Sequence, residues 1–177
     1  MTNETLWSVP VRVEDVPAEG QDFVCTADQP TRERLARAAG LVALRRLDAT
    51  FRVDHHGRGG LRVNGTVSAT VVQTCVVTLE PLTNEIVEDV DLVFDPAAPA
   101  EPAAGHEQTA FGSGEPPEPL VGGAIDLGAI ATEFLMLGID PYPRKPGAVF
   151  SVRETPEADA HPFAALAALK KRQSEED

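Results

Sequence analysis

The sequence has few aromatic residues and few cysteines. Aromatic residues make up 5% of the 177 residues while 42% are hydrophobic, so a core must be built mainly from Val, Leu, Ile and Ala. The two cysteines, Cys25 and Cys75, are too few for the disulfide framework of a small secreted domain. We expect both to be buried as small apolar residues with reduced thiols.

Long apolar runs are also missing. No run approaches the roughly 20 residues that a membrane-spanning helix needs. The first ten residues, Met1 to Pro10, lack the basic head and apolar centre of a secretory signal. These absences predict a cytoplasmic protein that does not associate with membranes.

Positive charge is absent from the centre of the chain. No Lys or Arg occurs between Val63 and Pro143, and this span supplies the whole net charge of −13. Its acidic residues are Glu80, Glu85, Glu88, Asp89, Asp91, Asp95, Glu101, Glu107, Glu115, Glu118, Asp126, Glu133 and Asp140. The negative electrostatic field of these carboxylates repels phosphate backbones and attracts a basic partner. The alternative is a face that only keeps the protein soluble.

Catalytic motifs are absent as well. The chain has no phosphate-binding glycine loop, nucleophile elbow, zinc-binding helix pattern or repeated cysteine pair. His55 and His56 are adjacent in a predicted loop and point apart, which disfavours a shared metal. We therefore expect no enzyme, no cofactor and no metal. The enzymatic alternative is a metal-dependent hydrolase using Glu88, Asp89 and Asp91, of which the last two share one side of a strand.

The clearest pattern present is a period of two over residues 60–79. One face carries Leu61, Val63, Val67, Ala69, Val71, Cys75, Val77 and Leu79. The other face is mostly Thr, Ser, Asn and Arg, which is typical of a strand with one buried face. Similar patterns over 41–53 and 85–94, separated by turns, predict an antiparallel β-meander.

One hydrophobic helix is predicted over 125–138, with Asp126 as its N-cap and Gly138 at its end. Its apolar stripe consists of Leu127, Ile130, Phe134 and Leu137, widened by Leu135 and Met136. A shorter helix is predicted over 28–40 with Asp28 or Thr31 as its cap, and a C-terminal short helix over 161–172. Residues 96–122 form a Pro/Ala/Gly-rich loop that we expect to be flexible. The predicted fold is α+β, with one domain over 1–150 and a linker and tail over 151–177.

Three stretches resemble the YceD family, which is named for the accumulation of large-subunit ribosomal RNA. They are 65–75 followed by Leu79-Glu-Pro81, 125–147, and 161–170. The resemblance implies a non-enzymatic role in the processing or accumulation of large-subunit rRNA. Many relatives carry Cys-x-x-Cys at the turn where this chain has Cys75-Val-Val-Thr78, so a zinc role is not carried over.

Together these features lead to the hypothesis of a ribosome-biogenesis factor that binds proteins. Its partner is expected to be a basic ribosomal protein or rRNA-processing factor, with only indirect association with large-subunit rRNA. The candidate contacts are Glu80, Glu85, Glu88, Asp89, Asp91, Arg144, Lys145, Phe163, Leu166 and Leu169. The alternative is direct rRNA contact through Arg32, Arg34, Arg37, Arg45, Arg46 and Arg52.

Overall fold

A computed structural model of the chain describes residues 6–98 and 116–150. The chain divides into two compact units, Met1–Pro146 and Gly147–Asp177. Of the second unit only residues 147–150 are described. The fold below is that of the first unit, and the predicted helix over 161–172, with Phe163, Leu166 and Leu169, lies outside the described residues.

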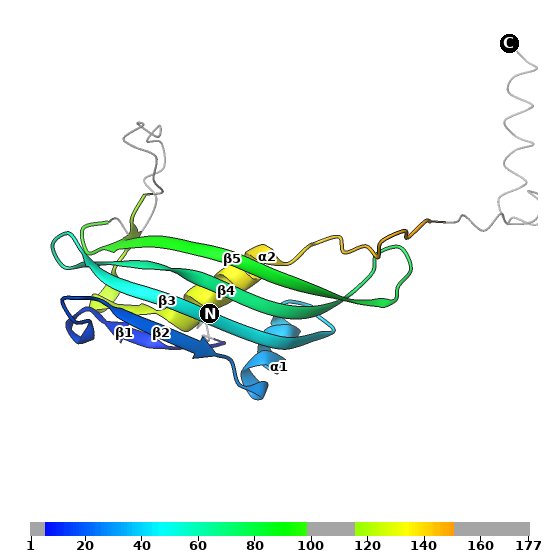
Figure 1. The fold of residues 1–177 in the computed structure, drawn as a ribbon, viewed down its shortest axis with the longest axis horizontal. Coiled ribbons are helices and arrows are strands. Elements are labelled where there is room, and N and C mark those ends of the chain that lie inside the picture. Colours follow the sequence, from blue (N-terminus) through cyan, green and yellow to red (C-terminus); the bar gives the residue numbers. More distant parts are fainter. Residues whose placement is uncertain (1–5, 99–115, 151–177) are drawn as a thin grey trace, which may run out of the picture. The chain divides into compact units, whose positions relative to one another are not determined.

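The centre of the fold is a five-stranded sheet with the order β2-β3-β4-β5-β6. Its strands are β2 (Gln21–Thr26), β3 (Ala43–His56), β4 (Gly60–Thr74), β5 (Pro81–Asp95) and β6 (Glu118–Pro119). Strands β2 to β5 are antiparallel and lie side by side in Figure 1, whereas β6 joins the end of β5 in parallel. The predicted α+β fold with an antiparallel meander is confirmed.

Tight turns and alternating side chains explain the β3–β4 hairpin. Gly57 and Gly59 both have positive φ in the connecting turn, a conformation that glycine adopts without steric cost. Gly65 lies in β4 where a Cβ atom would clash with the backbone oxygen of Thr50. A side chain at this position would therefore push the two central strands apart.

The core lies between one face of the sheet and two helices. The inward residues of β4 are fully buried, namely Leu61, Val63, Val67, Ala69 and Val71. Helix α2 (Leu127–Gly138) covers β4 and β5 and crosses behind them in Figure 1, while α1 (Gln29–Ala38) lies against β3. The sheet is thus covered on one face, as its sequence pattern predicted.

Helix α2 buries a different stripe from the predicted one. Its buried residues are Leu127, Gly128, Ile130, Ala131 and Leu135. Phe134 is only half-buried and Leu137 is 70% exposed, so the prediction that Leu137 belongs to the core stripe is wrong. The helix contacts the sheet through a face rotated away from Leu137, which leaves this apolar side chain on its flank.

The predicted N-cap of α2 also fastens the beginning of the chain. The Asp126 carboxylate accepts hydrogen bonds from the backbone N–H groups of Gly128 and Ala129, as a cap should. It accepts two more from Val9 N–H and the Ser8 hydroxyl. Beside it, β1 (Pro10–Arg12) pairs with β7 (Ala124–Asp126) in a small antiparallel sheet.

Two predicted boundaries differ from the structure. Strand β4 ends at Thr74 rather than near Leu79, which is exposed and has a positive φ. Of the predicted loop 96–122, residues 99–115 lie outside the described part, and its last residues include β6 and a 3₁₀ turn, η2 (Val121–Gly123). A second 3₁₀ turn, η1, spans Val13–Asp15. No helix within the described ranges is long and apolar enough to cross a membrane.

Candidate functional site

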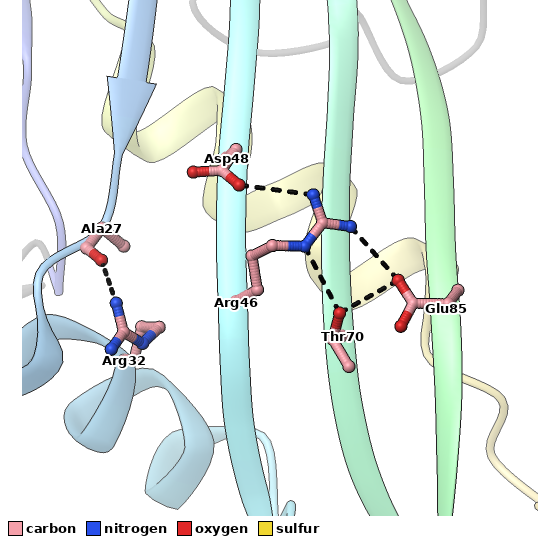
Figure 2. A network of polar contacts seen from close by, with 6 residues as sticks. All are labelled: Ala27, Arg32, Arg46, Asp48, Thr70 and Glu85. Atoms are coloured by element: carbon pink, nitrogen blue, oxygen red, sulfur yellow. Dashed lines mark hydrogen bonds and ion pairs between the residues drawn. The ribbon is translucent and has the colours of Figure 1, made fainter.

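The face of the sheet opposite α2 is covered by no helix among the described residues, and we call it the uncovered face. It carries a network of cross-strand charges. Arg46 on β3 donates hydrogen bonds to Asp48, to the Thr70 hydroxyl on β4 and to Glu85 on β5 (Figure 2). Arg62 on β4 forms two hydrogen bonds, of 3.0 and 2.8 Å, with the Asp91 carboxylate on β5. These bonds lower the pKa of Asp91. The cations of the central strands therefore neutralise part of the acidic strand.

The acidic residues of β5 lie on both of its faces. Glu85, Asp89 and Asp91 project from the uncovered face, as their pairing with β4 residues shows. Glu88 lies on the covered face, where its carboxylate is close to Gly138 at the end of α2. Asp89 accepts a hydrogen bond from Thr66 at 3.2 Å. Within the described part of the chain, neither Glu88 nor Asp89 has an ion-pair partner.

The turn between β4 and β5 is bound to the segment that follows α2. Val76 N–H donates to the Pro143 carbonyl at 2.9 Å, and the Gln73 amide donates to the Asp140 carbonyl at 2.7 Å. Lys145 forms an ion pair with Glu80 at 2.8 Å and lowers the pKa of Glu80. We call these contacts the hairpin clasp. Glu80 and Lys145, both predicted as partner contacts, therefore contact each other, while Arg144 is exposed beside them.

Cys75 lies at the centre of the hairpin clasp and is fully buried. Its Sγ accepts hydrogen bonds from the backbone N–H groups of Thr78 and Lys145, each at 3.4 Å. Hydrogen bonding from Thr78, chiefly through its side chain, and from Lys145 lowers the thiol pKa to about 6. This turn therefore holds a single cysteine sulfur. With Thr at position 78 it does not supply the several thiolates or imidazoles of a structural zinc site.

A groove with a volume of about 1060 Å³ runs between β5 and α2. Its apolar lining comes from Leu92 and Phe94 on β5 and from Ile130, Phe134 and Leu137 on α2. Acidic residues also line the groove, including Asp89, Asp91, Glu118 and Glu133. Arg62, already paired with Asp91, is the only basic residue among the described residues that line the groove.

Sequence reasoning missed this groove, although the sequence contained a signal for it. Helix α2 carries more large apolar side chains than one buried stripe can hold. The surplus residues, Phe134 and Leu137, line the groove together with the buried Ile130. An apolar face wider than the predicted core contact was therefore the sign of a second surface on α2.

The arginines proposed for direct RNA contact are divided between two elements. Arg32, Arg34 and Arg37 lie on α1, and Arg45, Arg46 and Arg52 lie on β3. Arg32 donates to the Ala27 carbonyl (Figure 2), and Arg34 donates to the Leu6 carbonyl. Arg52 contacts Asp22, Asp54 and the Glu19 carbonyl. Most of these guanidinium groups are thus already engaged within the fold.

The carboxylates of the enzymatic alternative are also separated by the sheet. Asp89 and Asp91 share the uncovered face, as predicted, whereas Glu88 points to the opposite face. No group of three His, Cys, Asp or Glu side chains suited to a metal occurs in the described part of the chain. His55 contacts the Val16 carbonyl at 2.8 Å. Both cysteines are buried and unpaired, as expected.

Comparison with known proteins identifies one family. The family model described as "Large ribosomal RNA subunit accumulation protein YceD" matches residues 63–170, which is more than half of the chain. The matched range includes most of β4, all of β5, the hairpin clasp and every groove-lining residue named above except Arg62. Searches of curated proteins and of solved structures gave no match.

Proposed function

Because the chain belongs to the YceD family of large ribosomal RNA subunit accumulation proteins, we propose that it supports large-subunit rRNA accumulation by binding a basic protein. The partner is a ribosomal protein or an rRNA-processing factor, and rRNA is reached through that partner. In this proposal the protein acts in the cytoplasm as a binding factor and catalyses no reaction.

One observation carries the proposal: β5 presents a row of carboxylates beside an apolar groove. Only Glu85 and Asp91 within this row have an arginine partner in the described part of the chain. Those pairs are exposed, so water screens them and they exchange readily for contacts with an incoming cation. An acidic surface of this kind raises the rate of encounter with basic proteins at low salt.

The state of the arginines supports protein binding over direct RNA contact. RNA binding without base recognition depends on several cations that neutralise phosphates together. Here Arg46 and Arg52 are held by carboxylates on the same face of the sheet. Their charge is therefore partly neutralised before any phosphate arrives.

The test is capture of partners by the tagged full-length chain from its own cells. We expect large-subunit proteins or rRNA-processing factors with the wild type, and several-fold less with Asp89→Lys. Asp22→Lys is the matched control, because Asp22 is an exposed acidic residue on β2 at the opposite edge of the sheet. Recovery of neither class of protein by the wild type would contradict the proposal.

A second measurement connects binding to rRNA. Cells that lack the protein should accumulate less mature large-subunit rRNA relative to small-subunit rRNA. Wild type and Asp22→Lys should restore the ratio, whereas Asp89→Lys should restore it only in part. Full restoration by Asp89→Lys would show that the acidic strand is not the functional surface.

A further inference from the structure

Within the part of the chain that the structure describes, strand β5 has an outer edge that is unpaired over most of its length. On one side it pairs with β4 from Pro81 to Phe94, and on the other side β6 pairs only with Phe94 and Asp95. Between Glu85 and Val93, no strand or other backbone segment among residues 6–98 and 116–150 hydrogen-bonds to this edge. An unpaired edge offers N–H and C=O groups to another strand, and β6 already uses the last two positions.

The hydrogen-bond pattern identifies which residues face outward. Cys75 N–H donates to the Glu80 carbonyl, which sets the alternation along the β4–β5 pair. Residues of odd number in β5 then direct their backbone groups away from β4. Two further hydrogen bonds agree with this assignment. The carbonyl of Asp95, an odd-numbered residue, points away from β4 and accepts from Leu120 N–H, and the Val72 carbonyl on β4 points away from β5 and accepts from Val42 N–H. The outward backbone groups therefore belong to Glu85, Val87, Asp89, Asp91 and Val93.

A strand added at this edge would meet two different surfaces. Successive side chains of a strand point to opposite faces. One set would lie on the uncovered face beside Glu85, Asp89 and Asp91, and the other set would enter the groove against Phe134 and Leu137. Exposed carboxylates favour basic neighbours across a strand pair, and the groove favours apolar side chains.

The same charges make other uses of the edge unfavourable. Two copies of β5 placed edge to edge would bring carboxylates against carboxylates, which is destabilising. The opposite edge of the sheet, β2, has six residues and one acidic residue, Asp22, which is paired with Arg52. A basic strand is therefore attracted to β5 more strongly than to β2, and a second copy of this chain is repelled.

We propose that β5 binds an extended segment of a basic protein by strand addition along Glu85–Val93, the segment alternating basic residues with apolar residues. This inference rests on the proposed function, and it specifies the partner's conformation and its sequence pattern. The main-chain hydrogen bonds supply affinity for any extended chain, and the alternation supplies specificity.

The test uses the full-length protein and a synthetic peptide of about ten residues, the upper length of a typical strand, that alternates Lys with Val. A second peptide of the same composition has all its Lys residues at one end. We expect binding of the alternating peptide, weaker binding at higher salt, and binding of the block peptide that is weaker by about tenfold or more. Equal binding of both peptides would contradict the proposed alternation of basic and apolar residues in the bound segment.

Val87→Pro tests the edge itself. The substitution removes an outward N–H and leaves the hydrogen bonds to β4 in place. Edge strands tolerate proline at such a position. Val87→Thr is the matched control, because it keeps the N–H at a side chain that is 65% exposed. Peptide binding should weaken by about tenfold or more in Val87→Pro and stay within about twofold in Val87→Thr. Unchanged binding in Val87→Pro would overturn strand addition.

Hydrogen exchange of the wild type gives a readout that does not depend on the fold of any variant. Peptide binding should slow exchange at the Val87, Asp89 and Asp91 amides, whereas the amides of Ile86 and Val90, which face β4, are already slow. Protection elsewhere, or a wild-type dimer that Val87→Pro dissociates, would overturn the inference. If the capture experiment succeeds and these tests fail, the proposed function stands with another mode of binding; if capture fails, the proposed function itself is lost.

Discussion

Strands β4 and β5 are neighbours of fifteen residues each, and they differ in what surrounds them. Strand β4 has a partner along both edges, and its inward side chains are fully buried. Among residues 6–98 and 116–150, strand β5 has a full partner on one edge only, and it carries carboxylates on both faces. The two strands thus differ in the described part of the chain: the inward side chains of β4 form the centre of the core, whereas most of the outer edge of β5 has no partner strand.

The largest expected effect is on the free energy of unfolding, when a buried side chain of β4 is truncated. Leu61→Ala should lower the free energy of unfolding by about 2–5 kcal/mol, because it leaves a cavity in the core. Val87→Ala on β5 should change it by no more than about 0.5 kcal/mol. Urea denaturation of the two variants measures both values. Similar losses would show that β5 contributes to stability as β4 does.

The next effect concerns the backbone amides of the two strands in the free protein. Amides of β4 face partners on both sides and should exchange slowly along the strand. In β5, amides at Glu85, Val87, Asp89 and Asp91 should exchange faster than those of Ile86, Glu88 and Val90 by on the order of a hundredfold or more. Hydrogen exchange followed by NMR resolves this alternation. Uniformly slow exchange in β5 would mean that its outer edge is already paired.

The turn that joins the strands should make stability depend on pH. The folded state lowers the pKa of Cys75 from 9.0 to about 6, so the thiolate favours folding. This contribution is fully present above pH 9 and is lost as the pH falls through about 6. Between these values wild-type stability should rise with pH more steeply than that of Cys75→Ser, which has no thiol to titrate. Parallel curves from urea denaturation at several pH values would contradict this.

The smallest effect is expected from the ion pair between the two strands. Arg62→Gln removes the pair with Asp91, but both side chains are about half exposed and water screens their interaction. The denaturation midpoint should therefore barely move. Binding of the alternating basic peptide should become tighter, because Asp91 loses its competing cation. Weaker binding would indicate that Arg62 itself contacts the partner.

Local patterns in the sequence predicted the elements well. The alternation over 60–74 identified the buried face of β4, and Asp126 was correctly assigned as the cap of α2. The shared face of Asp89 and Asp91 also followed from a period of two. Each of these predictions depends on residues close together in the chain, where geometry repeats regularly.

Contacts between distant residues could not be predicted in this way. Nothing near Lys145 indicates that its backbone N–H reaches Cys75, seventy positions earlier. The groove depends on how α2 is rotated over the sheet, and that rotation exposes Leu137 instead of burying it. Both features arise from packing between elements, which a pattern within one element does not contain.

The bonds from Asp126 to the start of the chain have a consequence for the order of folding. Val9 and Asp126 are 117 positions apart, so forming this contact closes a long loop. The entropy of loop closure is lost before the contact contributes any favourable free energy. The meander of β2 to β5 involves nearer residues and can form first. The earliest strand of the sequence, β1, would then be among the last to reach its place, because its partner β7 is synthesised more than a hundred residues later.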